Sequence, residues 1–369
     1  MSRISEVDRN LAVREKIEGV ELCFRNARQK PFAVYGLLPG TAEEPFRRIP
    51  QQTAQAVSEG VLALHARTAG GRVRFQTDSS CVAIRAKMPE KCLMPHMTFL
   101  GSSGFDLYLT EGAECRYAGS FMPPVNRADG YESIIRFPDR SLRDITINFP
   151  LYDAVDELLI GLEPGALLQS GKKYRTELPV IYYGSSITQG GCASRPGNSY
   201  QAVISRMLNC DYRNLGWSGS ARGERVMAEY IAAQPMSLFF MDYDHNSPSA
   251  EHLAQTHEPF FLSVREKNPN LPVILASKTD LPLSPQAARE RDERRRIISR
   301  TYENALRRGD RNIRLIDGGT VFSELEEQGL TADSCTVDGC HPNDLGFFCM
   351  ARVFGRQIGE MLNWQCGAL

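Results

Sequence analysis

The chain of 369 residues lacks several features that would assign a protein to a class directly. No run approaches the ~18 consecutive apolar residues that a membrane-spanning helix needs, so we expect no membrane partner. The 43 basic and 44 acidic residues leave a net charge of −1, and this balance provides no basic surplus for binding nucleic acid. The hydrophobic fraction of 42% is typical of a globular protein.

The cysteines lack any metal-binding pattern. Ten of them are scattered between Cys23 and Cys366, and none forms a Cys-x-x-Cys pair. No histidine spacing completes a zinc motif, so we expect neither a metal nor an organic cofactor. The first ten residues contain no apolar stretch of the kind that a signal peptide carries. Together these absences favour free thiols and a cytoplasmic location.

The Gly-x-Ser-x-Gly elbow of α/β-hydrolases is also absent. The chain has instead the segment GSSITQG at 184–190, which follows an apolar, β-branched run at 178–183 and precedes apolar residues at helical spacing from 199 to 208. Two glycines bracket the segment and permit a sharp turn. Ser186 would then lie at the carboxyl end of a central strand, where open α/β sheets bind ligands, and we interpret it as a nucleophile.

A base for this serine lies far downstream, in the segment DGCHP at 338–342. Asp338 and His341 are three residues apart near the start of a predicted helix, so their side chains can hydrogen-bond within one turn. That bond would fix the histidine tautomer and leave the other ring nitrogen free to accept a proton from Ser186. The two segments together predict a Ser-His-Asp triad.

Other interpretations of these residues stay open. Ser186 could simply cap the helix that follows it, and Asp338 could cap a later one. His245 is a rival base because acidic residues flank it at 242 and 244, although neither has a spacing that would orient its ring. Cys192 is a rival nucleophile, although nothing nearby in the sequence lowers the pKa of its thiol.

The segments at 184–190 and 338–342 resemble the first and last sequence blocks of the SGNH (GDSL) hydrolases. In that family an aliphatic residue and then Thr or Ser follow the nucleophile, as they do after Ser186. Ser185 departs from the pattern, because many members carry Asp or Asn at that position. The position only flanks the nucleophile, so we expect the departure to be tolerated.

The resemblance also implies an oxyanion hole. The segment NLGWSGS at 214–220 is similar to the glycine block of the family, and DYDHN at 242–246 stands where the family has its asparagine block. The implied donors are the backbone N–H groups of Ser186 and Gly219 and the side-chain amide of Asn246. The asparagine block departs from its usual form, in which Gly precedes and Asp follows the asparagine.

Three residues that border these segments, Trp217, Arg195 and Tyr243, are candidates for contacts with the substrate. An exposed aromatic ring can stack on the face of a sugar. Trp217 could equally pack in the core, and the sequence leaves that choice open.

Short alternating strands fill the first part of the chain and predict an antiparallel β-sandwich. They are expected at 61–68, 72–77, 82–88, 105–109, 116–119, 132–137 and 144–149. The first two flank the turn residues Ala69–Gly71, a pattern typical of a hairpin. Gly104–Tyr108 resembles the signature of the GxDLY domain, a β-sandwich found ahead of some SGNH hydrolases. We expect Asp106 and Tyr108 to serve packing rather than substrate contact.

Beyond about residue 173, strands alternate with helices, which predicts a parallel sheet in a three-layer α/β/α domain. Strands are expected at 178–183, 211–215, 237–242, 272–277 and 313–316. Helices are expected at 199–208, 223–233, 250–267, 285–308, 321–328 and 342–362. The resemblance implies a flavodoxin-like arrangement. We therefore predict a jelly-roll-like β-sandwich domain at 1–172 and an SGNH hydrolase domain at 173–369.

The resemblance implies a serine esterase that acts on small acyl esters without a cofactor. Many relatives with an N-terminal β-sandwich resemble carbohydrate esterases, so the first expectation is removal of acetyl groups from a small or oligosaccharide substrate. Cleavage of short-chain lipid esters or thioesters is a second expectation. A catalytically inactive carbohydrate-binding protein is a rival from another class, and a homo-oligomer is left open.

Overall fold

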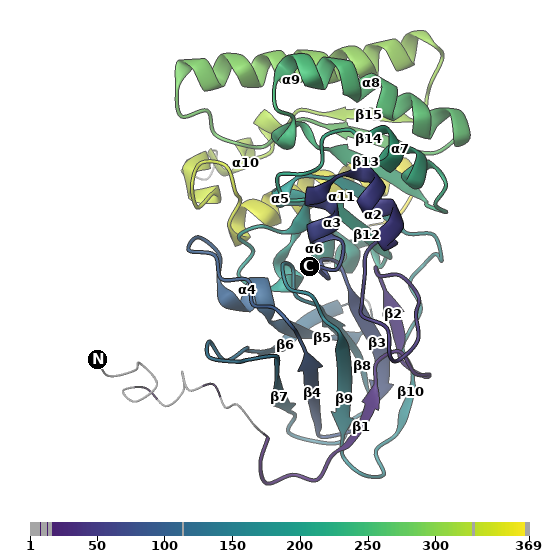
Figure 1. The fold of residues 1–369 in the computed structure, drawn as a ribbon, viewed down its shortest axis with the longest axis vertical. Coiled ribbons are helices and arrows are strands. Elements are labelled where there is room, and N and C mark those ends of the chain that lie inside the picture. The colour runs from purple at the N-terminus through teal and green to yellow at the C-terminus, as the bar shows by residue number, and fades with distance from the viewer. Residues whose placement is uncertain (1–7, 9–12, 14–16, 113, 327–328, 366–369) are drawn as a thin grey trace.

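The computed structural model describes residues 8, 13, 17–112, 114–326 and 329–365. Figure 1 shows two parts stacked along the long axis, with a β-sandwich below and a helix-covered parallel sheet above. The sequence-based predictions for the outer ends of both domains, for residues 327 and 328 of a helix and for Cys366 lie outside the described residues. Among the described residues, no helix combines the length and apolar character needed to cross a bilayer.

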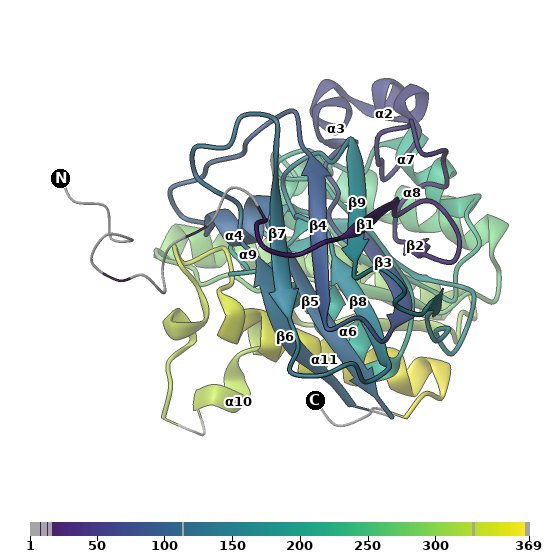
Figure 2. The same cartoon turned by 90° about the horizontal axis from the view of Figure 1, so that it is seen from below.

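The lower part consists of two antiparallel sheets packed face to face, which confirms the predicted sandwich (Figure 2). One sheet has the order β1-β9-β4-β7, and the other has the order β10-β3-β8-β5-β6 with β2 paired to β3. The strands are β1 (Cys23–Asn26), β2 (Ala33–Tyr35), β3 (Arg72–Thr77), β4 (Cys81–Lys87), β5 (Phe105–Glu111), β6 (Glu114–Phe121), β7 (Gly130–Arg136), β8 (Arg143–Asn148), β9 (Glu157–Leu162) and β10 (Leu168–Ser170). The sequence analysis predicted no strand for the segments that form β9 and β10.

Strand alternation explains how β5 is buried on both sides. Phe105, Leu107 and Leu109 point into the sandwich core, as period-two alternation requires. Asp106 and Tyr108 point the other way and are buried nonetheless, with exposed fractions of 0% and 3%. The outer face of this sheet therefore packs against the upper part of the molecule.

The predicted strand at 61–68 is wrong. Glu59–Leu64 forms a helix, α3, which follows α2 (Gln51–Val57), and β3 forms no hairpin with it. Ser58 caps α3 by accepting a hydrogen bond from the Val61 N–H at 3.2 Å. Val61 and His65, four residues apart, are the buried positions, so the burial follows a helical period rather than strand alternation.

The upper part is a five-stranded parallel sheet with the order β12-β11-β13-β14-β15, which is the flavodoxin-like order. The strands are β11 (Val180–Gly184), β12 (Tyr212–Gly216), β13 (Leu238–Asp242), β14 (Val273–Ala276) and β15 (Ile313–Ile316). The longer helices are α6 (Tyr200–Leu208), α7 (Arg225–Ala232), α8 (Ala250–Lys267), α9 (Pro285–Arg307) and α11 (Asp344–Leu362). The short elements are α4 (Phe99–Ser103) of the lower part, α5 (Ser186–Gln189), α10 (Ser323–Glu326) and 3₁₀ turns at Pro196–Asn198, Asp244–Asn246, Gly318–Thr320 and Ala332–Cys335.

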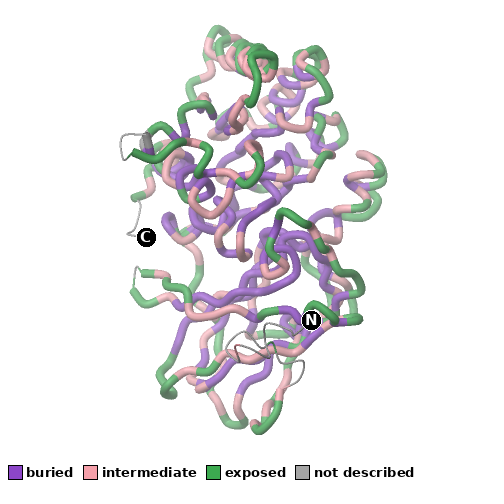
Figure 3. The backbone as a smooth tube through the Cα atoms, turned by 90° about the vertical axis from the view of Figure 1, so that its left-hand side faces the viewer, coloured by how far each residue is buried: buried purple, intermediate pink, exposed green. Residues whose placement is uncertain are grey.

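Alternate residues of β11 enter two different cores. Val180 and Tyr182 pack with α6 and α11, whereas Ile181 and Tyr183 pack with α7, α8 and α9. The sheet is thus covered on both faces, which confirms the predicted three layers. Helices α2 and α3 join the second core although they precede most of the sandwich strands in sequence. Figure 3 shows buried backbone, in purple, in both parts and where they meet.

Asp106 joins the two parts. Its carboxylate accepts hydrogen bonds from Asn148 Nδ2 at 2.8 Å within the sandwich and from the Gly197 N–H at 2.8 Å in the upper part. Arg195 Nη1 lies 3.1 Å from the same carboxylate and also donates to the Tyr108 hydroxyl. The GxDLY residues therefore hold the loop at 195–197, as expected from their packing role.

We expect Asp106→Ala to lower the free energy of unfolding by about 3–5 kcal/mol, because it leaves a partly buried guanidinium and several donors without their partner. Urea denaturation followed by circular dichroism measures the change. Glu111→Ala is the matched control on the same strand, since Glu111 pairs with Arg116 at 2.7 Å in solvent, and we expect it to cost less than about 1 kcal/mol. Equal losses in both variants would contradict the role given to Asp106.

Candidate active site

Ser186 is the first residue of α5, immediately after the central strand β11. Ser185 precedes it as the helix cap, and its Oγ accepts from the Ile187 N–H at 3.2 Å. Gly184 is required at the strand end, since a Cβ there would lie 1.9 Å from Asp242 Oδ1. The turn buries Ser185 completely and leaves Ser186 partly exposed.

His341 brings an imidazole to this serine from the loop before α11. Its Nε2 lies 2.9 Å from Ser186 Oγ, and its Nδ1 lies 2.8 Å from Asp338 Oδ2. A carboxylate only accepts hydrogen bonds, so the proton resides on Nδ1 and leaves Nε2 as the acceptor for the serine hydroxyl. The structure therefore brings the three residues of the predicted triad into one hydrogen-bonded line.

The loop at 338–341 is arranged to keep Asp338 ionised. Partial burial by itself raises the pKa of the Asp338 carboxyl. Hydrogen bonds from the His341 and Cys340 N–H groups and from the His341 ring outweigh it and lower the pKa below its usual value. The two N–H groups donate to Oδ1 at 2.7 and 3.0 Å. Gly339, with φ of 82°, adopts the left-handed conformation that this tight loop requires.

The rival base His245 lacks an orienting carboxylate. Asp242 accepts from the Thr188 and Tyr200 hydroxyls at 2.8 and 3.1 Å, and Asp244 accepts from the Lys278 N–H at 3.1 Å. His245 contacts Cys340 Sγ at 3.8 Å instead. Burial, and then the nearby cations, lower its pKa well below the usual value, so its ring is neutral.

The rival nucleophile Cys192 lies in the same loop region but carries a protonated thiol. Its side chain is 6% exposed. Burial, followed by the charge of Asp338, raises the pKa of this thiol to about 12, whereas a reactive cysteine needs a lowered pKa. Its φ of 76° is unusual for a residue with a side chain.

Among the described side chains, those of His96, Cys192 and His341 form one group whose potential metal-ligand atoms lie within 4.8 Å of one another. A soft cation is the kind of metal that a thiol and two imidazoles would suit. Both ring nitrogens of His341 are already hydrogen-bonded, however, and the Cys192 thiol is protonated. A bound cation would therefore have to disrupt the contact between His341 and Ser186.

Of the three residues suggested as oxyanion donors, Ser186 follows β11, and Gly219 and Asn246 lie beyond the ends of the strands that flank it. Gly219 is exposed and has φ of 66°, a conformation that glycine adopts readily. Asn246 donates one amide hydrogen to the Trp217 carbonyl at 2.7 Å. Its amide carries a second hydrogen, which can be donated to another acceptor. Gly216 is committed to packing, because a Cβ there would lie 2.2 Å from the Gln189 nitrogen.

Two of the three suggested substrate contacts need correction. Trp217 and Tyr243 are 0% and 1% exposed, so neither ring is available to stack on a sugar. The guanidinium of Arg48 covers the Trp217 ring at 3.9 Å, and the Tyr243 ring packs beside Tyr183. Arg195 is held by the GxDLY residues described above.

Two residues of the N-terminal part reach the site and escaped the sequence analysis. The exposed ring of His96 lies 5.5 Å from that of His341, centroid to centroid. The Tyr152 hydroxyl donates to the Ser186 carbonyl at 3.3 Å. No local motif marks either residue, because their positions depend on how the sandwich docks onto the parallel sheet.

Family comparisons match both parts of the chain. A model of the GDSL-like lipase/acylhydrolase family matches residues 177–359, and a model of the GxDLY domain, the N-terminus of SGNH-hydrolase-type esterases, matches residues 22–168. A comparison with curated proteins gave no match.

Solved structures share the whole two-part fold. A GDSL-like lipase from Bacteroides ovatus has a TM-score of 0.83 and 24% identity, over 94% of this chain and 100% of that one. The salicylyl-acyltransferase SsfX3 of a tetracycline biosynthetic pathway has a TM-score of 0.74 and 19% identity, over 92% and 97%. An acetyl xylan esterase from Butyrivibrio proteoclasticus has a TM-score of 0.59 and 13% identity, over 94% and 100%. At these identities the likeness shows a common fold.

We expect iodoacetamide at about pH 8 to leave Cys192 unmodified in the native protein while the exposed Cys23 reacts, because only an accessible thiolate is nucleophilic. Mass spectrometry of the digested protein measures both sites. Both should react after unfolding in urea, which is the control. Rapid labelling of Cys192 in the folded protein would restore it as a candidate nucleophile.

Proposed function

The chain belongs to the GDSL-like lipase/acylhydrolase family of hydrolases, and on this premise we propose that it is a serine esterase with a triad of Ser186, His341 and Asp338. The observation that carries the proposal is the unbroken line of hydrogen bonds from Ser186 Oγ through the His341 ring to the Asp338 carboxylate. A serine that served only to cap a helix would need no hydrogen bond to a histidine that an aspartate orients. Ser185, next to it, already caps α5.

In the acylation step, Ser186 Oγ attacks the ester carbonyl carbon and its proton passes to His341 Nε2. The new C–O bond converts the carbonyl oxygen into an oxyanion, and Asp338 stabilises the imidazolium that has formed. When the tetrahedral intermediate collapses, the bond to the leaving oxygen breaks. His341 gives its proton to that oxygen, which departs as an alcohol and leaves an acyl-serine.

In the deacylation step, water replaces the alcohol. His341 Nε2 takes a proton from the water as its oxygen attacks the acyl carbon, and then returns a proton to Ser186 Oγ. The products are a carboxylic acid and the free enzyme. The chemistry balances with water as the only co-reactant.

The oxyanion forms twice in this cycle, and we assign its stabilisation to the N–H groups of Ser186 and Gly219 and the amide of Asn246. One such donor typically contributes about 3 kcal/mol to the transition state. Two observations favour Gly219 over Gly216. The Gly216 N–H already donates to Asn214 Oδ1 at 2.9 Å, whereas Gly219 is exposed.

We assign the substrate to small acyl esters of carbohydrates, with acetyl as the acyl group. The fold shared with the acetyl xylan esterase supports this class. The surroundings of His341 are suited to a polar alcohol, because the exposed imidazole of His96 lies beside it. One exposed apolar side chain lies close by, since Leu283 is 79% exposed and contacts Gly339.

Transfer of the acyl group to an alcohol instead of water is a second candidate function. The specific observation in its favour is the fold shared with the salicylyl-acyltransferase, whose TM-score of 0.74 exceeds that of the acetyl xylan esterase. Both functions use the same acyl-serine and differ only in the second acceptor. Measuring acid release against ester formation in the presence of an added sugar separates them.

We expect Ser186→Ala to reduce kcat/KM for p-nitrophenyl acetate by at least about 10⁴-fold while the circular dichroism spectrum is kept, because the variant loses the nucleophile but no packing. Ser185→Ala is the matched control. It should keep most of the activity and lose about 1 kcal/mol of stability with the helix cap.

A fluorophosphonate probe tests the same serine without turnover. It should label the natural chain and the Ser185 variant but not the Ser186 variant. Undiminished hydrolysis by Ser186→Ala would refute the triad, and absence of labelling in the natural chain would favour a non-catalytic carbohydrate-binding protein.

We expect acetylated xylo-oligosaccharides to be deacetylated with a kcat/KM at least about tenfold higher than that for p-nitrophenyl octanoate, since a small acyl site discriminates against added methylenes. Acetate release is measured enzymatically, and the Ser186 variant provides the background. The opposite preference would move the assignment to lipid esters while leaving the triad intact.

A further inference from the structure

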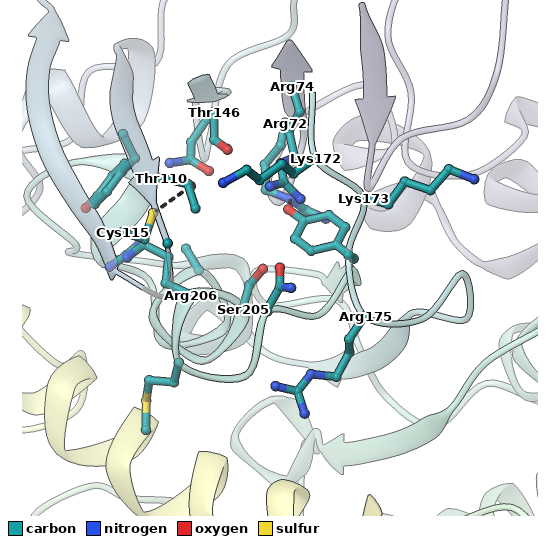
Figure 4. Close-up of a pocket in the computed structure, with 17 residues that line it drawn as sticks. Arg72, Arg74, Thr110, Cys115, Thr146, Lys172, Lys173, Arg175, Ser205 and Arg206 are labelled. Carbon is teal, nitrogen blue, oxygen red and sulfur yellow. Dashed lines mark hydrogen bonds between the residues drawn. The ribbon is translucent and has the colours of Figure 1, made fainter. Parts of the chain in front are cut away.

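A cavity of about 360 Å³ lies where the two parts of the molecule meet, apart from the triad (Figure 4). Its walls come from the sandwich strands β3, β5, β6 and β8, from the linker at 172–175 and from helix α6. None of Ser186, His341 and Asp338 lines it. The volume falls within the range typical of sites for small ligands.

The lining of this cavity is strongly cationic. Six basic residues line it, namely Arg72, Arg74, Lys172, Lys173, Arg175 and Arg206. Among the described residues, no Asp or Glu lines it. Two carboxylates lie behind the wall, where Asp211 pairs with Arg72 and Asp144 lies 3.5 Å from Arg74. Lys173 of the linker pairs with Glu177 at 3.6 Å. The positive charge that remains lies on Lys172 and Arg175 of the linker and on Arg206 of α6.

Two of these cations form no ion pair with the described residues. Arg206 donates to the Gly197 carbonyl at 2.7 Å, and its guanidinium lies over the Tyr108 ring at 4.1 Å. The Lys172 ammonium forms no ion pair with the described residues. In Figure 4 the Lys172 side chain points into the cavity, whereas the neighbouring Lys173 points away from it.

Arg74 provides a second, independent observation that points to a ligand. Its side chain is only 4% exposed, and its Nε and Nη1 atoms are buried without a hydrogen-bond partner. Buried donors of this kind are rarely left unsatisfied in folded proteins. The Tyr174 ring lies 4.3 Å from the guanidinium, and both residues line the cavity, so the positive charge of Arg74 is held at its wall.

We propose that this cavity binds a small phosphorylated sugar or polyol. The phosphoryl group lies between the Lys172 ammonium, which donates hydrogen bonds to it, and the positive charge of the Arg74 guanidinium, an arrangement that suits a dianion better than a single carboxylate. Thr110, Thr146 and Ser205 line the same cavity and offer hydroxyl partners for the remainder of the ligand. Such a ligand bridges the sandwich, the linker and α6, so its binding stabilises the junction between the two parts.

The site does not depend on the proposed esterase chemistry, and the experiment keeps the two separate. Isothermal titration calorimetry of the full chain uses ribose 5-phosphate as the probe, with ribose and inorganic phosphate in parallel. We expect saturable binding of ribose 5-phosphate, weaker binding of inorganic phosphate and no binding of ribose. Ser186→Ala should bind ribose 5-phosphate with an unchanged Kd.

Two adjacent lysines give a matched pair of variants. Lys172→Glu should weaken the binding of ribose 5-phosphate by at least about tenfold, because it replaces a charge-assisted donor with a like charge. Lys173→Glu makes the same charge change on the side chain that points away, and it should alter the Kd by less than about twofold. Because salt screens both positions alike, the difference between the two variants reports direct contact with the ligand. Ester hydrolysis should be unchanged in both variants.

Arg74→Gln tests the buried donors, and Thr146→Val provides a second variant from the same wall in case the first does not fold. Each of these two variants should weaken the binding of ribose 5-phosphate. In thermal unfolding, added ribose 5-phosphate should raise the Tm of the natural chain more than that of Lys172→Glu. No saturable binding of ribose 5-phosphate, equal binding of ribose, or equal losses in the Lys172 and Lys173 variants would overturn the proposal.

Discussion

The carboxylate of Asp106 is the constraint on which the arrangement of the two parts depends. It leaves the sandwich from the outer face of β5 and accepts from Gly197 and Arg195, which belong to the loop that follows the Ser186 turn. That loop is held at its other end by Asp344, the first residue of α11, which accepts from the Ser194 N–H at 2.8 Å. One buried acid thus connects the sandwich to the elements that carry Ser186 and His341.

The junction is polar for a physical reason. The outer face of the second sheet must be buried, yet β3 and β5 carry Arg72, Arg74 and Asp106 on that face. A buried charge is tolerated when its hydrogen bonds are satisfied, so Asp106 and Arg72, whose partners include Gly197 and Asp211 of the upper part, determine which loops fit against this face. Arg48 acts similarly beside α3, where its guanidinium donates to the Leu64 carbonyl at 3.0 Å and to the Asn214 carbonyl at 3.3 Å. Hydrogen bonds of this kind are directional, so they fix the position of the sandwich relative to the upper part more tightly than apolar packing alone would.

The sequence identified what is local and missed what depends on docking. The β11 turn, the loop at 338–341 and the alternation of the parallel sheet could be predicted because each rests on neighbouring residues, and the order of the strands followed from the family resemblance. The burial of Trp217 could not, since the residues that surround it, Arg48 among them, are distant in sequence. The strand predicted at 61–68 failed because four successive residues, Val61 to Leu64, fit both periods, and the cap at Ser58 decides between them. His96 reaches His341 only through the orientation of the sandwich.

The strand order explains why the proposed nucleophile belongs on β11. With β12 and β13 on either side, the segments that follow all three strands end at one edge of the sheet. Two hydrogen bonds tie them together, from the Trp217 N–H to the Gly184 carbonyl at 2.9 Å and from Asn246 to the Trp217 carbonyl at 2.7 Å. Only the middle strand can place a side chain between donors from both neighbours. The imidazole must then come from outside the sheet, and α11, which packs against α6 on one face, begins beside that edge. A base carried by β14 or β15 would lie at least one strand further from Ser186, beyond hydrogen-bond reach.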